Sequence, residues 1–198
     1  MKILRVAGDL YPAFVGGIAI HAHEMSKKQA SSGNEVTVYT SIWGDEPLEE
    51  GRDNYRIVRF RGITIFRNSI APRLFYRLFQ ERKAYDIIHA HSHLYFSTVF
   101  CALVRMLGSP PLVVTNHGLI SQTAPMWLQK IYIPTIGRWI YSTADKIICY
   151  TETERDQLID LGIRPEKISV IHNGVDTDHF APLTNVTPKK QILWIGKY

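Results

Sequence analysis

Paired glycines near the amino terminus are the first candidates for chemistry in this chain. Gly16-Gly17 comes shortly after an apolar segment of strand length and opens a predicted helix. Glycines at a helix start let a ligand approach the backbone, and the free amides and helix dipole favour an anion such as a phosphate. A flexible loop tip before a helix explains Gly-Gly equally well, so both interpretations stay open. The chain has neither a Gly-x-Gly-x-x-Gly fingerprint nor a Walker A pattern, which removes the main support for a dinucleotide or P-loop site.

Histidines gather at the ends of two other predicted strands. In His89-Ala90-His91-Ser92-His93 alternate residues share a face, so three imidazoles could converge on a metal. No Asp, Glu or Cys accompanies them nearby, and a metal needs a complete ligand set. We therefore favour structural or substrate-contacting histidines and expect no metal. In Asn116-His117-Gly118 the imidazole is well placed to donate to a ligand oxygen. The alternative is a histidine that only hydrogen-bonds its own loop, and we favour the site interpretation.

The elements that must position these residues alternate between strand and helix signals. Expected strands are 2–7, 35–40, 86–90, 112–115, 146–150 and 167–171, with a hairpin of 56–60 and 63–66 across Arg61-Gly62. Expected helices are 18–30, 71–83, 94–107, 126–143 with an interruption at Pro134, and 151–161 with a Thr151/Glu154 capping box. This order predicts an α/β fold with a Rossmann-like, doubly wound, mostly parallel sheet and helices on both faces. Ligands of such folds bind outside the carboxyl ends of the strands.

Composition narrows the class of protein. A chain of 198 residues with 45% hydrophobic side chains fits one domain with a substantial core. The net charge of +5 is local, because residues 51–83 hold nine Lys or Arg against Asp53 and Glu81, an excess of +7. We expect anionic partners but no nucleic acid. Two cysteines in apolar runs, no signal peptide and no run of ~20 apolar residues predict a cytoplasmic protein.

The last segment of the chain predicts the start of a second domain. Residues 1–181 form the expected first domain, 182–190 a linker marked by Pro and Thr, and 191–198 a new strand. A strand with nothing after it cannot bury both faces. We therefore expect the polypeptide to be cut where a second domain begins, with residues from about Gln191 onward poorly anchored or packed on a neighbouring surface.

Taken in order, these motifs resemble one known family. The chain is similar to the retaining GT-B glycosyltransferases of family 4, also called group 1, over essentially its whole length. The matching segments are Tyr11-Pro12, Gly16-Gly17-Ile18, Gly33-Asn34-Glu35-Val36, Asp86-Ile87-Ile88-His89-Ala90-His91, Thr115-Asn116-His117-Gly118, Ala144-Asp145-Lys146, His172-Asn173-Gly174-Val175-Asp176 and Ile195-Gly196-Lys197. The family often has His where this chain has Asn34, and Pro where this chain has His172. We interpret both departures as structural.

The resemblance implies two Rossmann-like domains with the active site in the cleft between them. This chain would be the N-terminal, mainly acceptor-binding half, and no essential metal or other cofactor is expected. Gly16 and Gly17 would place backbone amides on the diphosphate of a nucleotide-sugar donor, and Lys197 falls where an Arg commonly pairs with that diphosphate. Lysine keeps the charge but not the bidentate fork. His117 matches a histidine that contacts the donor sugar near the reacting centre.

The same resemblance predicts a sugar or lipid-linked acceptor, with Tyr11, His91, Ser92 and Asn116 as candidate acceptor or substrate contacts. It also shows what the chain lacks. The family's paired glutamates near the nucleotide lie in the C-terminal domain, and no pair with their spacing occurs here. We therefore expect the 198-residue chain to be inactive alone.

A basic segment allows two interpretations. Residues 70–83 could lie on an anionic membrane, with aromatic side chains inserted and Arg73 and Arg77 outside, as a peripheral contact at the inner membrane face. An amphipathic helix packed on the sheet with a solvated basic face explains the pattern as well. We favour the packed helix because its apolar stripe has the usual width. We likewise expect the aromatic residues Trp127, Tyr132, Trp139 and Tyr141 to lie in the core or a domain interface.

Two further functions remain open from the sequence. The chain could be a non-catalytic sugar- or sugar-phosphate-binding module, in which case its reading frame would not continue into a half with the paired glutamates. A nucleotide-sugar epimerase of similar architecture would instead convert the donor without any acceptor.

Overall fold

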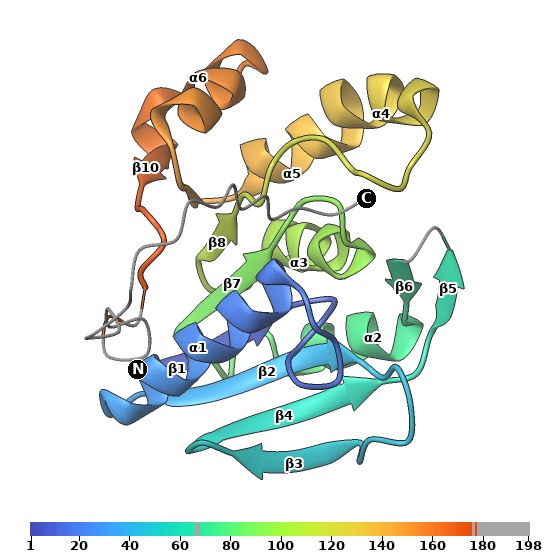
Figure 1. Ribbon diagram of the computed structural model, residues 1–198, viewed down its shortest axis with the longest axis vertical. Helices are drawn as coiled ribbons and strands as arrows, with labels where there is room; N and C mark the ends of the chain where they lie inside the picture. Colours follow the sequence, from blue (N-terminus) through green and yellow to red (C-terminus); the bar gives the residue numbers. More distant parts are fainter. Residues whose placement is uncertain (66–67, 176, 178–198) are drawn as a thin grey trace, which may run out of the picture.

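The computed structural model describes residues 1–65, 68–175 and 177 (Figure 1). Its strands are β1 Lys2–Val6, β2 Glu35–Ser41, β3 Glu49–Arg52, β4 Tyr55–Phe60, β5 Ile63–Ile65, β6 Asn68–Ile70, β7 Ile87–His91, β8 Leu112–Thr115, β9 Lys146–Cys149 and β10 Ile168–Val170. Its helices are α1 Gly17–Ser31, α2 Pro72–Glu81, α3 Phe96–Met106, α4 Met126–Tyr132, the π-helical turn η1 Ile133–Gly137, α5 Arg138–Thr143, α6 Glu152–Asp160 and the 3-10 turn η2 Pro165–Lys167. The linker and final strand predicted for 182–198 lie outside the described residues.

Within the described residues, one sheet has the strand order β10-β9-β8-β7-β1-β2-β4-β3. Every neighbouring pair is parallel except β3 with β4. The predicted Rossmann-like, doubly wound sheet is therefore confirmed. The winding reverses at β1, which lies between β2 and β7, and such a switch point opens a crevice at the carboxyl ends of the strands.

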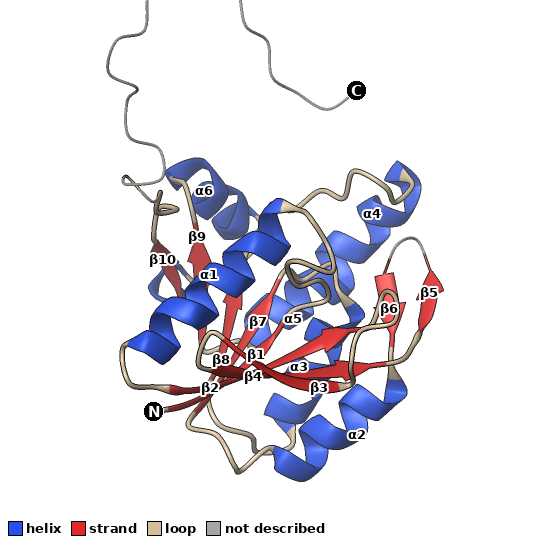
Figure 2. Ribbon diagram, turned by 60° about the horizontal axis from the view of Figure 1, so that its bottom comes forward, coloured by secondary structure: helices blue, strands red, loops and turns tan. Residues whose placement is uncertain are grey.

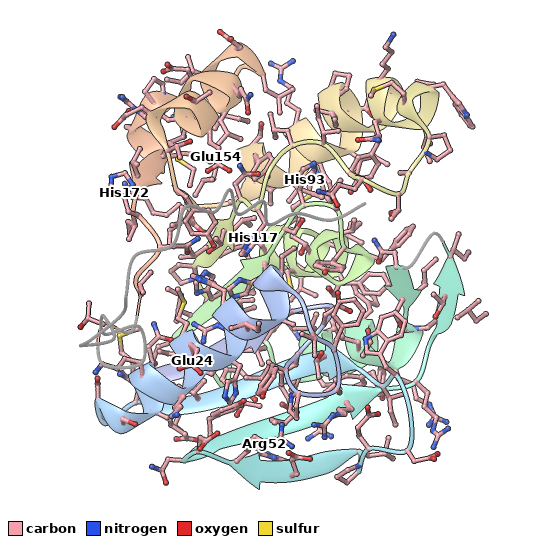
Figure 3. The ribbon with its side chains drawn as sticks, in the orientation of Figure 1. Glu24, Arg52, His93, His117, Glu154 and His172 are labelled. Carbon is pink, nitrogen blue, oxygen red and sulfur yellow. The ribbon has the colours of Figure 1, made fainter. Side chains whose placement is uncertain are left out.

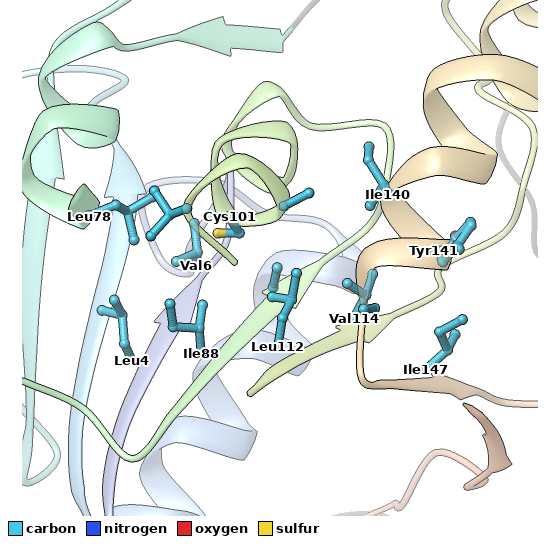
Figure 4. Close-up of a cluster of buried hydrophobic side chains, with 14 of the residues drawn as sticks. Leu4, Val6, Leu78, Ile88, Cys101, Leu112, Val114, Ile140, Tyr141 and Ile147 are labelled. Carbon is cyan, nitrogen blue, oxygen red and sulfur yellow. The ribbon is translucent and has the colours of Figure 1, made fainter. Parts of the chain in front are cut away.

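Alternation along the strands divides the core between the two faces of the sheet. Leu4, Val6 and Ile88 pack with buried side chains of α2, α3 and α5 in one cluster (Figure 4). Ile3, Val36 and Ile57 belong to a second cluster with alanines of α1. Helices α1 and α2 accordingly lie on opposite sides of the sheet in Figure 2. Because successive strand residues point to opposite faces, both clusters form from the same strands.

The hairpin predicted for 56–60 and 63–66 is wrong. β4 instead pairs with β3, across a turn in which Asp53 and Asn54 have φ of 46° and 64°. β5 pairs with β6 in a separate two-stranded sheet. The left-handed turn matches the twist of an antiparallel pair, and Asp and Asn tolerate it better than most residues. β3 was missed because the sequence Glu49-Glu50-Gly51-Arg52 lacks the usual strand residues.

The helix predicted for 126–143 is continuous but changes its winding. α4 leads into η1, which contains Pro134, and α5 follows without a break. Proline removes one backbone donor, and a π turn is a common way for a helix to absorb that loss. The interruption expected at Pro134 is therefore a local change from α-helical to π-helical winding and not a break in the helix.

Within the described residues, the two edge strands of the large sheet are β3 and β10. β3 is charged, and β10 is three residues long.

Candidate active site at the carboxyl edge of the sheet

A pocket of about 300 Å³ opens at the carboxyl edge of the sheet, between the start of α1 and the ends of β8 and β9. Its lining residues are Gly17, Ile18, His21, His117, Tyr150, Glu154 and Asn173. Figure 3 shows His117 near the start of α1 in the middle of the molecule, with Glu154 on α6. The pocket thus combines residues from four segments that are far apart in the sequence.

The start of α1 presents unpaired backbone amides to this pocket. Gly16 is the N-cap residue and offers no side-chain cap, and the first turn holds no acidic residue. The first intrahelical bond runs from the Ile20 N–H to the Gly16 carbonyl, at 2.9 Å. The preceding helical amides therefore have no intrahelical partner. A Cβ at Gly17 would meet nothing within 4 Å, so there is room for a ligand against the backbone.

His117 lies at the centre of a cluster of rings. Its Nε2 is 3.1 Å from His91 Nδ1, and its Nδ1 is 3.2 Å from the Tyr150 hydroxyl. His21, on the first turns of α1, packs edge-on against His117 with ring centroids 5.4 Å apart. Burial, and to a lesser extent the charge of His21, lowers the pKa of His117 to about 3. His117 is therefore neutral near pH 7 and can donate or accept a hydrogen bond.

A buried arginine supports the cluster from behind. Arg5 on β1 donates to Ser26 Oγ and Gln29 Oε1 of α1, both at 2.7 Å, and to His89 Nδ1 at 3.3 Å. Since a guanidinium only donates, His89 Nδ1 accepts, and Nε2–H donates to Thr115 Oγ1 at 2.7 Å. Burial lowers the pKa of Arg5 to about 10, so it remains charged at neutral pH. This network ties α1 to β1, β7 and β8.

Three predicted substrate contacts lie behind His117 and do not line the pocket. His91, Ser92 and Asn116 are all fully buried or nearly so. Ser92 has φ of 61°, and its N–H donates to the Thr115 carbonyl at 2.9 Å. Asn116 Oδ1 accepts from the Tyr141 hydroxyl at 2.7 Å, while its Nδ2 has no hydrogen-bond partner among the described residues. Contact of these three with substrate stays a prediction.

The remaining predicted site residues have different positions. Gly16 and Gly17 form the start of α1, but Tyr11 packs against His23 with ring centroids 5.4 Å apart, outside the pocket lining. The Tyr11 carbonyl accepts from Arg52 Nη1 at 3.3 Å. Lys197 lies outside the described residues. A contribution of Tyr11 or Lys197 to ligand binding is therefore untested.

Sequence reasoning missed four polar residues of the pocket. His21 follows Gly17 by one helical turn, so helical spacing could have identified it. Tyr150 directly follows β9, and Glu154 lies on the first turn of α6, where its carboxylate accepts from the Tyr150 N–H at 2.7 Å. Asn173 belongs to a recognised motif but was not assigned a place. Only the fold reveals that the segments after β9 and β10 reach this pocket.

A second, larger hollow lies at the opposite edge of the sheet. It measures about 750 Å³ and is lined by residues at the amino ends of β1, β2 and β4, among them Lys2, Glu35 and Arg56. Lys2 already pairs with Glu35, and Arg56 with Glu49. Figure 3 shows Arg52, another lining residue, far from His117. Charges that neutralise each other at the amino edge do not suggest a ligand, so the smaller pocket is the better candidate.

No group of three or more His, Cys, Asp or Glu side chains in the described part of the chain is arranged to hold a metal ion. The three histidines of 89–93 separate instead. His89 and His91 stack at 4.7 Å on one face, whereas His93 Nδ1 pairs with the Tyr141 hydroxyl at 2.8 Å.

A Rossmann-like domain with open helix amides at the carboxyl edge of its sheet is typical of proteins that bind phosphorylated ligands. Residues 15–179 match the family model described as Glycosyltransferase Family 4. The chain belongs to this family and represents the N-terminal domain of its GT-B fold.

Relatives and solved structures agree with this assignment. The chain is 24% identical to a GDP-mannose:cellobiosyl-diphosphopolyprenol alpha-mannosyltransferase of Xanthomonas oryzae, over 100% of this chain and 52% of the relative. It is 29% identical to a UDP-Gal:alpha-D-GlcNAc-diphosphoundecaprenol alpha-1,3-galactosyltransferase of Escherichia coli, over 63% of this chain and 32% of the relative. Sucrose-phosphate synthase from Thermosynechococcus elongatus has the same fold, with a TM-score of 0.69 and 18% identity over 92% of this chain and 50% of that one. Two relatives match this chain from end to end, and the chain spans about half the length of each.

Proposed function

We propose that this chain is the mainly acceptor-binding half of a retaining hexosyltransferase. In the proposed reaction, the bond between the sugar anomeric carbon and the nucleoside diphosphate breaks. A bond from the same carbon to an acceptor hydroxyl forms with the same anomeric configuration. The observation that supports this best is the joint presence of the open α1 amides and neutral His117 in one pocket. The diphosphate gains negative charge as it departs, and preorganised amides stabilise that charge.

Each site residue predicted from the sequence has a role in this proposal. The amides at Gly16 and Gly17 bind the donor diphosphate, and Lys197 adds a positive charge to it. His117, held between His91 and Tyr150, hydrogen-bonds the donor sugar. Tyr11, His91, Ser92 and Asn116 contribute to the acceptor side. The reaction needs no metal, so added chelator should leave the rate unchanged.

Donor and acceptor classes follow from the named relatives. The Xanthomonas and Escherichia coli enzymes carry names that specify a nucleotide-sugar donor and a lipid-diphosphate-linked sugar acceptor. We propose the same two classes here and a location at the cytoplasmic face of a membrane. Contact of residues 70–83 with that membrane stays a prediction. In the structure Leu74 and Leu78 of α2 are buried, as expected for the packed helix that we favoured.

The test uses the protein at its full encoded length. Nucleotide sugars and acceptors are screened for product, and the anomeric configuration of the product is determined by NMR. His117→Ala should lower kcat by about a hundredfold or more while leaving the folded structure intact, because a transition-state contact is lost. Conversion of the donor without acceptor would indicate an epimerase, and binding without any turnover would indicate a sugar-phosphate-binding module.

A second measurement addresses the length of the chain. The 198-residue polypeptide alone should not transfer sugar, since the paired glutamates of the family are absent from it. Measurable transfer by this polypeptide would contradict the proposed division of labour between two domains.

A further inference from the structure

Two groups of exposed apolar side chains belong neither to the buried core nor to the lining of the pocket. On α4 and the segments that flank it, Trp127 is 66% exposed, Ile131 60% and Ile120 63%. On β5, Ile63 is 73% exposed and Ile65 45%. Trp127 therefore lies outside the core of the described residues, and its position in a domain interface stays a prediction. We call Ile63, Ile65, Ile120, Met126, Trp127 and Ile131 the apolar rim.

Both parts of the apolar rim are anchored to one loop at the carboxyl edge. The Tyr132 hydroxyl at the end of α4 donates to the His93 carbonyl at 2.6 Å. On the other side, Asn68 of β6 hydrogen-bonds the Leu94 carbonyl and accepts from the Phe96 N–H. Helix α4 and the β5–β6 pair lie on the right-hand side in both Figure 1 and Figure 2. The rim therefore flanks the loop that follows β7.

The apolar rim shares its edge of the sheet with the candidate active site. β5 follows the carboxyl end of β4, the anchoring loop follows β7, and the segment leading to α4 follows β8. His117 also follows the carboxyl end of β8. In a parallel sheet these ends lie at one edge. A partner surface that contacts the apolar rim would therefore also lie close to His117.

The surroundings of the rim carry almost no negative charge. From Ile87 to Ala144 the sequence has no Asp or Glu, and from Arg61 to Ile70 it has Arg61 and Arg67 but no acid. Lys130 is exposed on α4 between Trp127 and Ile131. An aromatic and aliphatic surface with basic residues and no acidic ones suits the interface of an anionic bilayer.

We propose that the apolar rim is the surface through which this protein contacts an anionic lipid bilayer. The inference extends the proposed function, because a lipid-linked acceptor would lie in that bilayer. None of the described helices is long and apolar enough to cross it. Helix α2 is less suited to the contact, since its Leu74 and Leu78 are buried and Arg77 pairs with Glu81 and Glu49. The contact is thus placed on α4 and β5.

The test is co-sedimentation with vesicles of phosphatidylcholine containing phosphatidylglycerol, at low salt and without donor or acceptor. Both the 198-residue chain and the full encoded protein are measured. Trp127→Ser/Ile131→Ser should weaken vesicle binding about tenfold or more, because two apolar side chains no longer enter the interface. Both side chains are mostly exposed, so circular dichroism and the unfolding midpoint should stay unchanged.

Matched variants locate the contact. Met106→Ser/Leu107→Ser removes two exposed apolar side chains, 65% and 54% exposed, at the opposite end of α3 and should bind like the parent. Arg73→Glu/Arg77→Glu should weaken binding less than the α4 variant. Absence of binding by the parent would overturn the proposal. So would undiminished binding by the α4 variant, a larger loss in the α2 variant, or a rim that instead mediates a dimer. Vesicle binding is read without turnover, so its failure is distinct from failure of the proposed transferase activity.

Discussion

Gly17 has open space where any other residue would place a side chain. A substitution at Gly17 can therefore test ligand binding without lowering the stability of the fold. A Cβ at Gly17 meets no atom within 4 Å, and alanine is favoured over glycine within helices by about 0.5–1 kcal/mol. Gly17→Ala should therefore keep or slightly raise the free energy of unfolding. It should weaken nucleotide-sugar binding, measured by calorimetry on the full encoded protein, about tenfold or more, because the methyl group enters the space that we propose for the diphosphate.

Gly33 provides the matched control for this variant. It lies beyond the end of α1 with φ of 84° and open space around its Cβ position. Gly33→Ala should cost about 1 kcal/mol of stability through backbone strain and leave nucleotide-sugar affinity unchanged. A Gly17→Ala protein with parental affinity would show that the α1 amides do not bind the donor.

At the scale of single elements, the capping of α6 positions two pocket residues. The Glu154 N–H donates to Thr151 Oγ1 at 3.2 Å, and Glu154 Oε2 accepts from the Tyr150 N–H. Thr151→Ala should lower the free energy of unfolding by about 1 kcal/mol, since an N-cap is lost. Denaturant titration measures this change. Thr153→Ala, at an exposed position inside the same helix, should be neutral or slightly stabilising, and equal losses in both variants would contradict the capping role.

The sequence predicts an element well when local signals define it, and poorly when pairing with distant strands defines it. The Thr151/Glu154 box and the glycine stop at Gly162 are local signals, and α6 has the predicted form. β3 was missed because its pairing with β4 depends on a tight turn and not on apolar residues. The hairpin across Gly62 was wrong because each strand prefers another partner, a choice that only the whole sheet decides.

The same distinction applies to the site. His117 and Gly17 were predicted from short motifs at strand ends, and both line the pocket. His21 and Tyr150 were not predicted, because a single histidine on a helix or tyrosine after a strand is common. Their meeting depends on the crossovers that bring α1 and the end of β9 together. The burial of Asn116 behind His117 is likewise a property of three-dimensional packing.

At the scale of the whole molecule, the buried histidines predict a stability that depends on pH. Burial lowers the pKa of His89 and His91 well below 6.5, that of His93 to about 4 and that of His117 to about 3. Below pH ~6.5 the unfolded chain takes up protons that the folded chain does not. The free energy of unfolding should therefore be greatest above pH ~6.5 and fall as the pH falls towards the folded-state pKa values.

The window from pH ~6.5 to ~5 isolates this effect, because carboxylates remain ionised there. Denaturant titrations across the window should show unfolding free energy rising with pH. In His89→Gln the slope should be smaller by up to about 1.4 kcal/mol per pH unit, the contribution of one proton. His172→Gln replaces an exposed histidine and is the matched control. A parental free energy that does not change across the window would contradict the neutral, buried state of the cluster.

The two edges of the large sheet bear on how the molecule behaves in concentrated solution. An unpaired strand edge can template pairing with another chain and start aggregation. Here β3 carries Glu49, Glu50 and Arg52, and β10 is three residues long. Charge on one edge and shortness at the other are common protections against such edge-to-edge association. Replacing Glu49 and Glu50 by threonine would remove this protection from β3, and the expected consequence is polymerisation through β3.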